Sequence, residues 1–315
     1  MTLFLLRRCA TLLGTLLLVS LVVFAVMNVL PGDPALVILG LDATPEAVAA
    51  LREELGLNDP LILRYLSWIG GAVWGDFGVS FSFDLPVSVL IAERLPITLA
   101  LAGMATVLTV SVALALGLFA ASRHGRPGDW GIMVLSQLGI AIPAFWLGML
   151  LILLVAVQWR LLPPGGFPGW SDPVQAIRAL ILPTVALALV QSAILTRVVR
   201  SSVLEVMRLD FARTARAKGL SRAAIFRRHI LPNALVPIIT IVGMQVANLV
   251  TGTIVIENVF SLPGLGRLVF QAISNRDLYM VQALVLLFAA VVVIANFLVD
   301  VAYALIDPRL QERLS

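Results

Sequence analysis

Six long apolar segments constrain this chain more than any other feature. A helix needs about 20 mostly apolar residues to cross roughly 30 Å of hydrocarbon at about 1.5 Å per residue. Because 60% of the residues are hydrophobic and only 13% are charged, we expect an all-α integral membrane protein. The six predicted transmembrane helices lie at 9–30, 97–121, 131–158, 179–200, 236–257 and 283–306.

Basic residues predict which way the six segments cross. An even number of spans places both termini on one side. If that side is cytoplasmic, the termini and inner loops hold fifteen of the 22 lysines and arginines, because positive charge collects in cytoplasmic loops. The net charge of +4 therefore reflects orientation and gives no reason to expect a nucleic-acid partner. The expected parts are a transmembrane helix at 1–30, an extracytoplasmic helical segment at 31–95, a membrane core at 96–306 with a cytoplasmic loop at 201–235, and a cytoplasmic tail at 307–315.

The segment 31–95 predicts short helices outside the membrane. In TPEAVAALREELG, Thr44 is a suitable N-cap, Pro45 suits the first helical position and Gly56 suits the stop. The next apolar run, 60–75, is too short to span, and its aromatic residues predict a helix in the membrane interface. Two interpretations stay open for this segment: a structural collar around the bundle, or a docking surface for an external partner.

Catalytic and cofactor motifs are absent from the sequence. The only lysine, Lys218, is followed by glycine, so the phosphate-binding pattern G-x-x-x-x-G-K-[ST] does not occur. His124 and His229 lie outside any H-E-x-x-H pattern, Cys9 is the single cysteine, and no G-x-S-x-G is present. We therefore expect no bound metal or cofactor and no enzyme activity, which leaves a transporter, a channel or a passive anchor.

The fifth predicted span carries a polar stripe. Gln245, Asn248 and Thr251 recur at spacings of three and share one side of a helix. This stripe is a candidate translocation path, and the competing interpretation is hydrogen bonding between packed helices. In the third span, Gly139 and Pro143 predict a kink. We find no ionisable residue deep in a span of the kind that a proton-coupled carrier is expected to hold.

Residues 210–232, DFARTARAKGLSRAAIFRRHILP, are the most basic stretch of the chain. Asp210 predicts the N-cap of a short helix over Phe211 to Lys218, and Gly219 suits a left-handed stop. A second short helix is expected to begin after Ser221 and to end against Pro232. A basic amphipathic loop resting on anionic lipid is the alternative interpretation.

Seven short sequence motifs resemble those of a known family. The pattern Ala215-x-x-x-Gly219 followed by Leu231 and Pro232 resembles the EAA signature of ABC-importer permeases. More narrowly, the chain resembles the first permease subunit of the dipeptide, oligopeptide and nickel importers. The supporting words are LPGDPA at 30–35, LREELGL at 51–57, GDFGVSF at 75–81, ERLPITL at 93–99, RTARAKGL at 213–220, RRHILPNAL at 227–235 and ENVFSLPGLGRL at 257–268.

The resemblance implies a fold, a location and partners. The fold would be that of a type I (MetI-like) importer permease, with an extra N-terminal span and an external helical segment before a five-span core. The location would be the bacterial cytoplasmic (inner) membrane, with both termini cytoplasmic. The implied partners are a homologous second permease, two ABC ATPase subunits that bind ATP and Mg, an extracytoplasmic substrate-binding protein and membrane lipid. Together they would import peptides or similar small solutes.

The resemblance also implies a role for the basic loop. In the family this loop is a coupling helix that sits in a groove of the ATPase. The residues carried over are Phe211, Arg213, Thr214, Ala215, Arg216, Lys218, Gly219, Leu231 and Pro232. Arg213, Thr214 and His229 replace the Glu, first Ala and Ile of the general signature, and the peptide branch resembles this chain at those places.

Other functions and substrates stay open at this point. The alternative functions are an ATPase-independent secondary carrier or channel and a non-transporting membrane scaffold. Dipeptides, oligopeptides, glutathione and nickel complexes are all possible substrates, and peptides are the favoured class.

Overall fold

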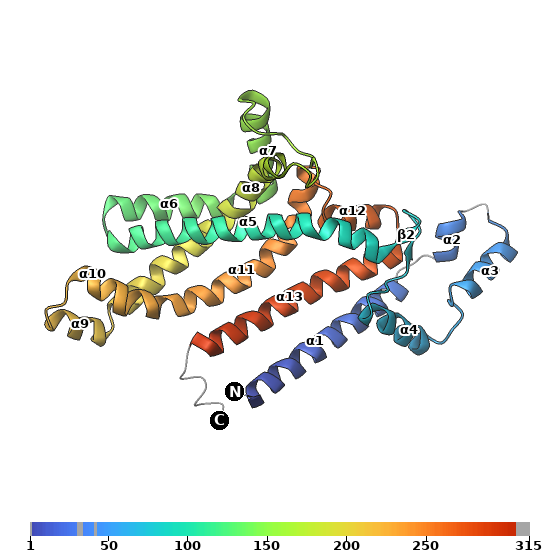
Figure 1. Ribbon diagram of the computed structural model, residues 1–315, viewed down its shortest axis with the longest axis horizontal. Coiled ribbons are helices and arrows are strands. Elements are labelled where there is room, and N and C mark those ends of the chain that lie inside the picture. The colour runs from blue at the N-terminus through green and yellow to red at the C-terminus, as the bar shows by residue number, and fades with distance from the viewer. Residues whose placement is uncertain (1, 30–33, 41–42, 307–315) are drawn as a thin grey trace.

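Long helices dominate the molecule (Figure 1). The structure, a computed structural model, describes residues 2–29, 34–40 and 43–306. In this part of the chain five helices are long and apolar enough to cross a membrane, and a bent pair makes a sixth candidate span. The five are α1 (Thr2–Val29), α5 (Val87–Ser122), α8 (Pro173–Met207), α11 (Leu231–Val259) and α13 (Leu278–Ile306).

Helix α5 begins earlier than the sequence predicted. Its predicted start was residue 97, but the helix starts at Val87 and continues through Pro96. Val87, Leu90 and Ile91 are buried in one apolar cluster with residues of α12 and α13, so the added turns have a packing partner. At about 1.5 Å per residue, the 36 residues of α5 extend beyond the hydrocarbon of a bilayer. Its first residues, 87–95, fall within the predicted segment 31–95 and are therefore part of a long helix.

The third predicted span is broken rather than kinked. Helix α6 (Pro127–Ala141) is followed by α7 (Ala144–Leu151), which continues as the π-helical segment η1 (Ile152–Gln158). The two parts meet at an angle of 97°. Ile142 has ψ 122°, because the ring of the following Pro143 disfavours a helical conformation at the residue before it. The break falls at Pro143, where the sequence predicted a kink, and it is sharper than a bend within one continuous helix.

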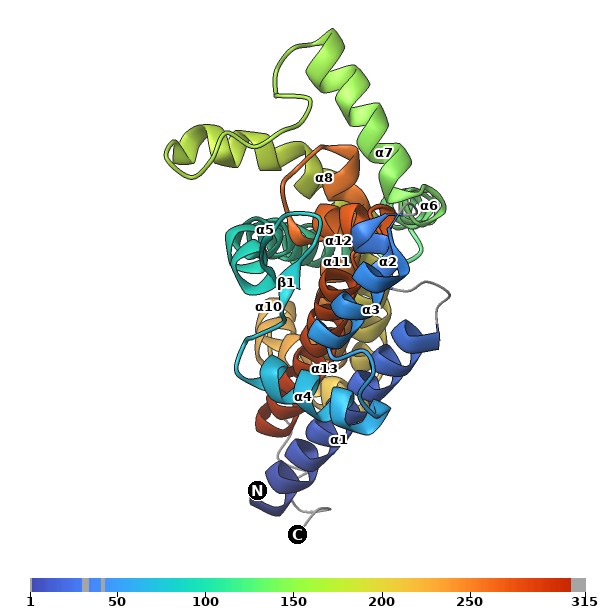
Figure 2. The same cartoon turned by 90° about the vertical axis from the view of Figure 1, so that its right-hand side faces the viewer.

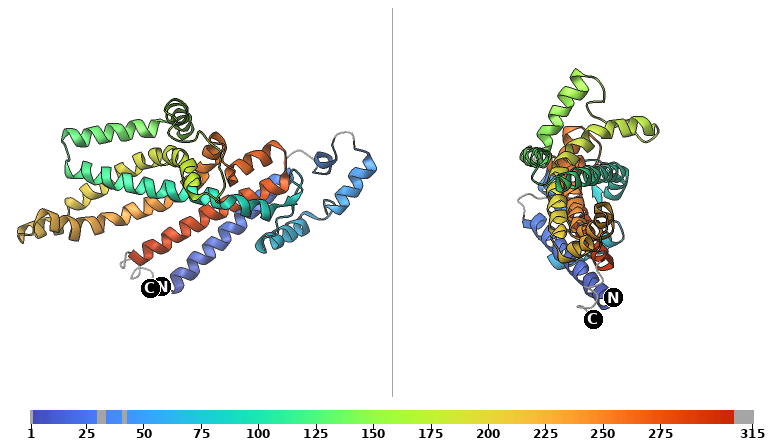
Figure 3. Two further views of the ribbon diagram at one scale, coloured as in Figure 1. Left: turned by 45° about the horizontal axis from the view of Figure 1, so that its top comes forward. Right: turned by 90° about the vertical axis from the view of Figure 1, so that its left-hand side faces the viewer.

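The long helices pack through small residues. A Cβ on Gly117 of α5 would lie 2.6 Å from Val199 of α8, and one on Gly243 of α11 would lie 1.8 Å from Val299 of α13. These glycines let the helix backbones approach closely, as is common in membranes. Helix α8 is the most buried of the five long helices. Helix α1 lies beside α13 at the edge of the bundle (Figure 3).

The segment between α1 and α5 folds into short elements. They are α2 (Pro34–Leu39), α3 (Pro45–Glu54), α4 (Leu61–Val73) and the antiparallel pair β1 (Val79–Ser80) and β2 (Leu85–Pro86). The predicted cap of α3 is confirmed, since Thr44 Oγ1 accepts a hydrogen bond of 3.3 Å from the Ala47 amide. Helix α4 packs on α1 through Tyr65, whose hydroxyl lies 2.8 Å from Ser20 Oγ.

The two ends of the bundle differ. Helices α9 (Asp210–Ala217) and α10 (Arg222–Ile225) lie at one end, and α12 (Leu265–Ser274) lies at the other (Figure 1). Figure 2 looks onto the second end. Helix α12 connects α11 to α13 there and contacts α5. The predicted tail at 307–315, with Arg309 and Arg313, lies outside the described residues.

Candidate functional site

The basic stretch forms a turn between two helices, which we call the elbow and define as residues 210–232. Helix α9 is followed by a reversal at Gly219, by α10, and by the π-helical segment η2 (Phe226–Ile230) that leads into α11. The elbow projects at the end of the bundle where α8 ends and α11 begins (Figure 3).

Hydrogen bonds explain the turn at Gly219. The Gly219 amide donates to the Arg216 carbonyl at 3.0 Å, and the Leu220 amide donates to the Ala215 carbonyl at 3.3 Å. This is the 5→2 and 6→1 pattern of a Schellman motif, which requires a left-handed residue at the C′ position. Gly219 has φ +78°, so the predicted left-handed stop is confirmed.

Alanines attach the elbow to the bundle. Ala212 and Ala215 are buried, and Ala215 belongs to an apolar cluster with residues of α5, α8, α10, η2 and α11. The cluster consists of Ala121, Val203, Val206, Ala215, Ile225, Ile230 and Ala234. Ala215 therefore joins the exposed helix α9 to the apolar cluster at this end of the bundle.

The opposite side of α9 is exposed and basic. Arg213, Arg216 and Lys218 are all exposed. Phe211 and Leu220 add apolar surface, with exposed fractions of 38% and 39%. Thr214 is also exposed, and its hydroxyl donates to the Asp210 carbonyl at 3.0 Å. The elbow therefore presents two hydrophobic side chains among positive charges, a combination suited to a partner with an acidic groove.

Two details of the elbow correct the sequence prediction. The N-cap of α9 is Leu209, and Asp210 is the first helical residue. Asp210 instead forms an exposed ion pair with Arg213 at 3.4 Å, which the i, i+3 spacing permits. The second short helix does begin with a Ser221 cap, because Ser221 Oγ accepts from the Ala224 amide at 3.3 Å.

That second helix does not end at Pro232. An unbroken helix runs from Ala223 to Val259, with Leu231 half-buried and Pro232 exposed in its course. A proline inside an α-helix lacks a donor and clashes with the carbonyl four residues before it. The wider turn of η2 directly precedes Pro232, which relieves this conflict, so α10, η2 and α11 form one continuous helix.

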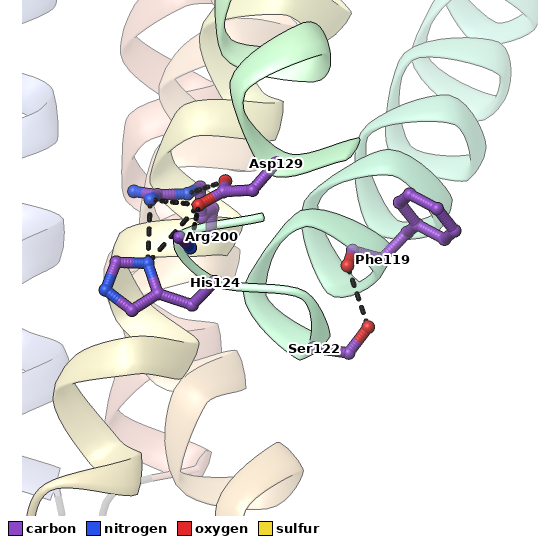
Figure 4. Close-up of polar contacts among 6 residues, drawn as sticks. Phe119, Ser122, His124, Asp129 and Arg200 are labelled. Carbon is purple, nitrogen blue, oxygen red and sulfur yellow. Dashed lines mark hydrogen bonds and ion pairs between the residues drawn. The ribbon is translucent and has the colours of Figure 1, made fainter. Parts of the chain in front are cut away.

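A second polar cluster lies near the elbow and was not predicted (Figure 4). Asp129, at the start of α6, has a side chain only 4% exposed and pairs with Arg200 of α8 at 2.5 Å. Arg200 also donates to the second carboxylate oxygen at 2.8 Å, and the Gly125 amide donates to that oxygen at 2.9 Å. His124 Nδ1 lies 3.3 Å from the same carboxylate. These contacts fasten the α5–α6 turn to α8.

We expect Asp129→Asn to lower the free energy of unfolding by about 1–3 kcal/mol, because the ion pair is lost and Arg200 is left half-buried. Thermal unfolding of the purified protein in detergent measures this change. Asp210→Asn is the matched control, since it removes an exposed carboxylate of the same type and should leave the unfolding midpoint unchanged. Equal effects of the two substitutions would contradict the structural role of Asp129.

The polar stripe of α11 is divided between two environments. Gln245 is buried and its amide donates to the Gln191 carbonyl of α8 at 3.1 Å. Asn248 and Thr251 are exposed, and the Thr251 hydroxyl donates to the Asn248 carbonyl at 3.0 Å. Gln245 thus takes part in helix packing, while Asn248 and Thr251 keep free surface on another side of the helix.

Glu257 organises the end of α11 that lies away from the elbow. It is completely buried, and its carboxylate accepts from the Thr98 hydroxyl of α5 at 2.7 Å and from the Gly266 and Arg267 amides at 2.7 and 3.2 Å. Those amides open α12, whose positive helix end favours a carboxylate. Sequence reasoning gave Glu257 no role, although it is an isolated acid in a hydrophobic run that two glycines follow closely.

Among the described residues, no group of three or more His, Cys, Asp or Glu side chains is placed to hold a metal ion.

Comparisons with known proteins agree over the whole chain. The family model for the binding-protein-dependent transport system inner membrane component matches residues 113–312. A model for the N-terminal part of such membrane components matches residues 1–102. The chain is 42% identical over 312 residues to a putative peptide transport system permease protein of Brucella abortus, which covers 99% of both chains. It is 36% identical to the dipeptide transport system permease protein DppB of Escherichia coli, over 98% of this chain and 99% of that one.

A solved structure shares the fold of the core. The inward-facing methionine ABC transporter MetNI contains a chain that matches 69% of this chain and 96% of its own length, with a TM-score of 0.56 and 20% identity. This likeness supports the MetI-like arrangement expected from the sequence.

Proposed function

Because the chain belongs to the family of binding-protein-dependent transport system inner membrane components and is a permease subunit of an ABC importer, we propose that it forms half of an import pathway for short peptides. The observation that carries the substrate class is its likeness to peptide permeases along nearly the whole chain. Peptide import by membranes that contain the assembled complex, and its loss when this chain is removed, tests the proposal.

We propose that the elbow is the surface that contacts the ATPase. Three features support this role: the Schellman turn at Gly219, the buried alanines that fix α9 to the bundle, and the exposed side chains Phe211, Arg213 and Arg216. An ATPase groove with acidic residues complements this surface. Leu231 and Pro232 then lie in the continuous helix that connects α10 with the rest of α11.

The remaining partners follow from the same proposal. The part of the chain that the structure describes has up to six candidate spans, which would supply half of a pathway, so a homologous second permease completes it. Two ABC ATPase subunits hydrolyse ATP with Mg, and an extracytoplasmic binding protein delivers the peptide. The elbow and both termini then face the cytoplasm of a bacterial inner membrane, and 31–95 lies outside as a segment separate from the core.

The mechanism we propose is alternating access. Closure of the ATPase dimer displaces the elbow, and the unbroken helix from Ala223 to Val259 transmits that displacement across the membrane. At its far end Glu257 links α11 to α12 and α5. Asn248 and Thr251, which are exposed on α11, are candidates for contact with the solute.

Reversing the two arginines on α9 tests the contact. We expect Arg213→Glu combined with Arg216→Glu to reduce peptide-stimulated ATP hydrolysis at least about tenfold, because like charges then face the acidic groove. ATP hydrolysis is measured in proteoliposomes at low and high salt. Salt screens the repulsion, so the difference in ATP hydrolysis between the variant and wild type should be smaller at high salt.

The matched control carries the same change of charge on a different face. Arg227 and Arg228 are exposed in η2, and reversing both alters the net charge equally. If this control reduced ATP hydrolysis as much as the α9 pair, the effect would come from general repulsion or lipid contact, and the proposed docking face would be wrong.

Purification separates this function from a stand-alone carrier. When the tagged chain is isolated from its own membranes, we expect one second permease and two Walker-A ATPase subunits to accompany each copy of it. Peptide uptake that continues without ATP, by the chain alone, would support a carrier instead.

A further inference from the structure

Two arginines converge on a small pocket at the end of the molecule opposite the elbow. The pocket has a volume of about 220 Å³ and is lined by Arg94, Pro263, Gly264, Arg267 and Gln271. Arg94 lies on α5 and Arg267 on α12, so the pocket spans the contact between these two helices. Counted from Ser122 at about 1.5 Å per residue, Arg94 is about 42 Å along α5, which places it beyond the hydrocarbon layer on the external side.

The guanidinium of Arg94 has unused hydrogen-bonding capacity. Its Nη1 is buried without a hydrogen-bond partner, and its Cζ lies 5.4 Å from the centroid of the Phe83 ring. A buried polar atom without a partner costs free energy, because it has given up its bonds to water. An acceptor that reached Nη1 would remove this cost.

Neighbouring acids do not supply that acceptor. The Glu257 carboxylate is already occupied by Thr98, Gly266 and the Arg267 amide. Glu93 is exposed beside Arg94. Within the described part of the chain neither Arg94 nor Arg267 forms an ion pair, and the Arg267 guanidinium donates only to the Ser261 carbonyl, at 2.8 Å. The pocket therefore holds two guanidinium groups and the Gln271 amide, and neither guanidinium is paired directly with a carboxylate in the described part of the chain.

We propose that Arg94, Arg267 and Gln271 form a carboxylate-binding site, and that its ligand is the C-terminal carboxylate of the peptide entering the permease. Guanidinium groups match carboxylate geometry through paired hydrogen bonds. The pocket is too small for a whole peptide but large enough for its terminal group. The site lies between α5 and α12, and Glu257 holds α12 against α11. A ligand in the site would therefore be linked, through α12, to the helix that runs from this end to the elbow. The identity of the ligand rests on the proposed peptide import.

The test compares a dipeptide with its C-terminal amide. Uptake of alanylalanine and of alanylalanine amide is measured in proteoliposomes with the assembled importer and one binding protein, whose own selectivity cancels when variants are compared with wild type. We expect Arg267→Gln to lower the preference for the acid about tenfold, because one charge-assisted contact is lost. Arg276→Gln, which removes an exposed arginine from the same end, should keep the preference.

Gln271→Glu gives a variant that retains both arginines. The new carboxylate would pair with them inside the pocket, so we expect thermal stability to be kept or raised while the preference for the acid disappears. An unchanged preference in Gln271→Glu and Arg267→Gln would overturn the proposal. An equal loss of acid and amide uptake would also overturn it, because the arginines would then serve a partner protein or the fold.

A second measurement does not depend on peptide transport. Phenylglyoxal modifies accessible guanidinium groups, and mass spectrometry of the purified complex reports the extent at Arg267. We expect acetate to protect Arg267 and acetamide to leave it reactive. If the wild type moves no peptide but acetate protects, the peptide proposal fails and the carboxylate site stands. Absence of protection, or stronger protection by inorganic phosphate, would overturn the site itself.

Discussion

Gly219→Val is expected to reduce peptide uptake at least about tenfold while the protein still inserts and folds. A left-handed conformation costs an L-residue about 1–2 kcal/mol, and the cost is larger for a β-branched side chain. Gly219 has φ +78° and nothing lies within 4 Å of a Cβ placed there, so the penalty comes from the backbone alone. Valine would open the Schellman turn and change the angle between α9 and α10. The readout is ATP hydrolysed per peptide imported, which should rise.

Gly219→Asn is the matched control. Asparagine tolerates the left-handed region better than other non-glycine residues, and the open space around position 219 accepts its side chain. We expect its uptake to stay within about twofold of wild type. If valine and asparagine behaved alike, the turn conformation would not be what couples the elbow to transport.

The membrane architecture could be predicted well because its physical causes are local. Apolar runs of sufficient length predicted the five long helices, and the Gly219 stop and the Thr44 and Ser221 caps depend only on neighbouring residues. Whether a helix breaks at a proline or continues through it was harder to predict. The 97° break before Pro143 and the passage of a helix through Pro232 depend on how neighbouring helices and a π-turn accommodate each proline.

The polar clusters could not be predicted because they join distant parts of the chain. Asp129 and Arg200 are 71 residues apart, and Thr98 and Glu257 are 159 residues apart. No local pattern reports such pairs. The sequence did contain a partial signal, since an isolated acid in an apolar stretch requires a partner. The polar stripe shows the same limit. Periodicity predicted that Gln245, Asn248 and Thr251 share one side of the helix, but it could not predict that helix packing buries Gln245 and leaves the other two exposed.

Replacing Glu257 should have the largest effect on stability. We expect Glu257→Ala to lower the free energy of unfolding by about 3 kcal/mol or more, because the Thr98 hydroxyl and two amides at the start of α12 lose their acceptor in a buried site. The site cannot collapse to compensate. A Cβ on Gly266 would already lie 2.3 Å from the Ile254 Cα, so the backbone of α12 is as close to α11 as glycine allows.

Two comparisons separate the hydrogen bonds of Glu257 from its volume. Glu257→Gln keeps the shape of the side chain and one acceptor oxygen. Its free energy of unfolding should therefore lie between those of wild type and Glu257→Ala. Gly264→Ala keeps the glutamate but places a Cβ 2.3 Å from its carboxyl carbon, and we expect it to destabilise α12 by displacing that group. Thermal unfolding of the assembled complex in detergent, with and without the Thr98→Val substitution, measures the coupling between α5 and α11. Additive losses for Thr98→Val and Glu257→Ala would show that the carboxylate does not hold these helices together.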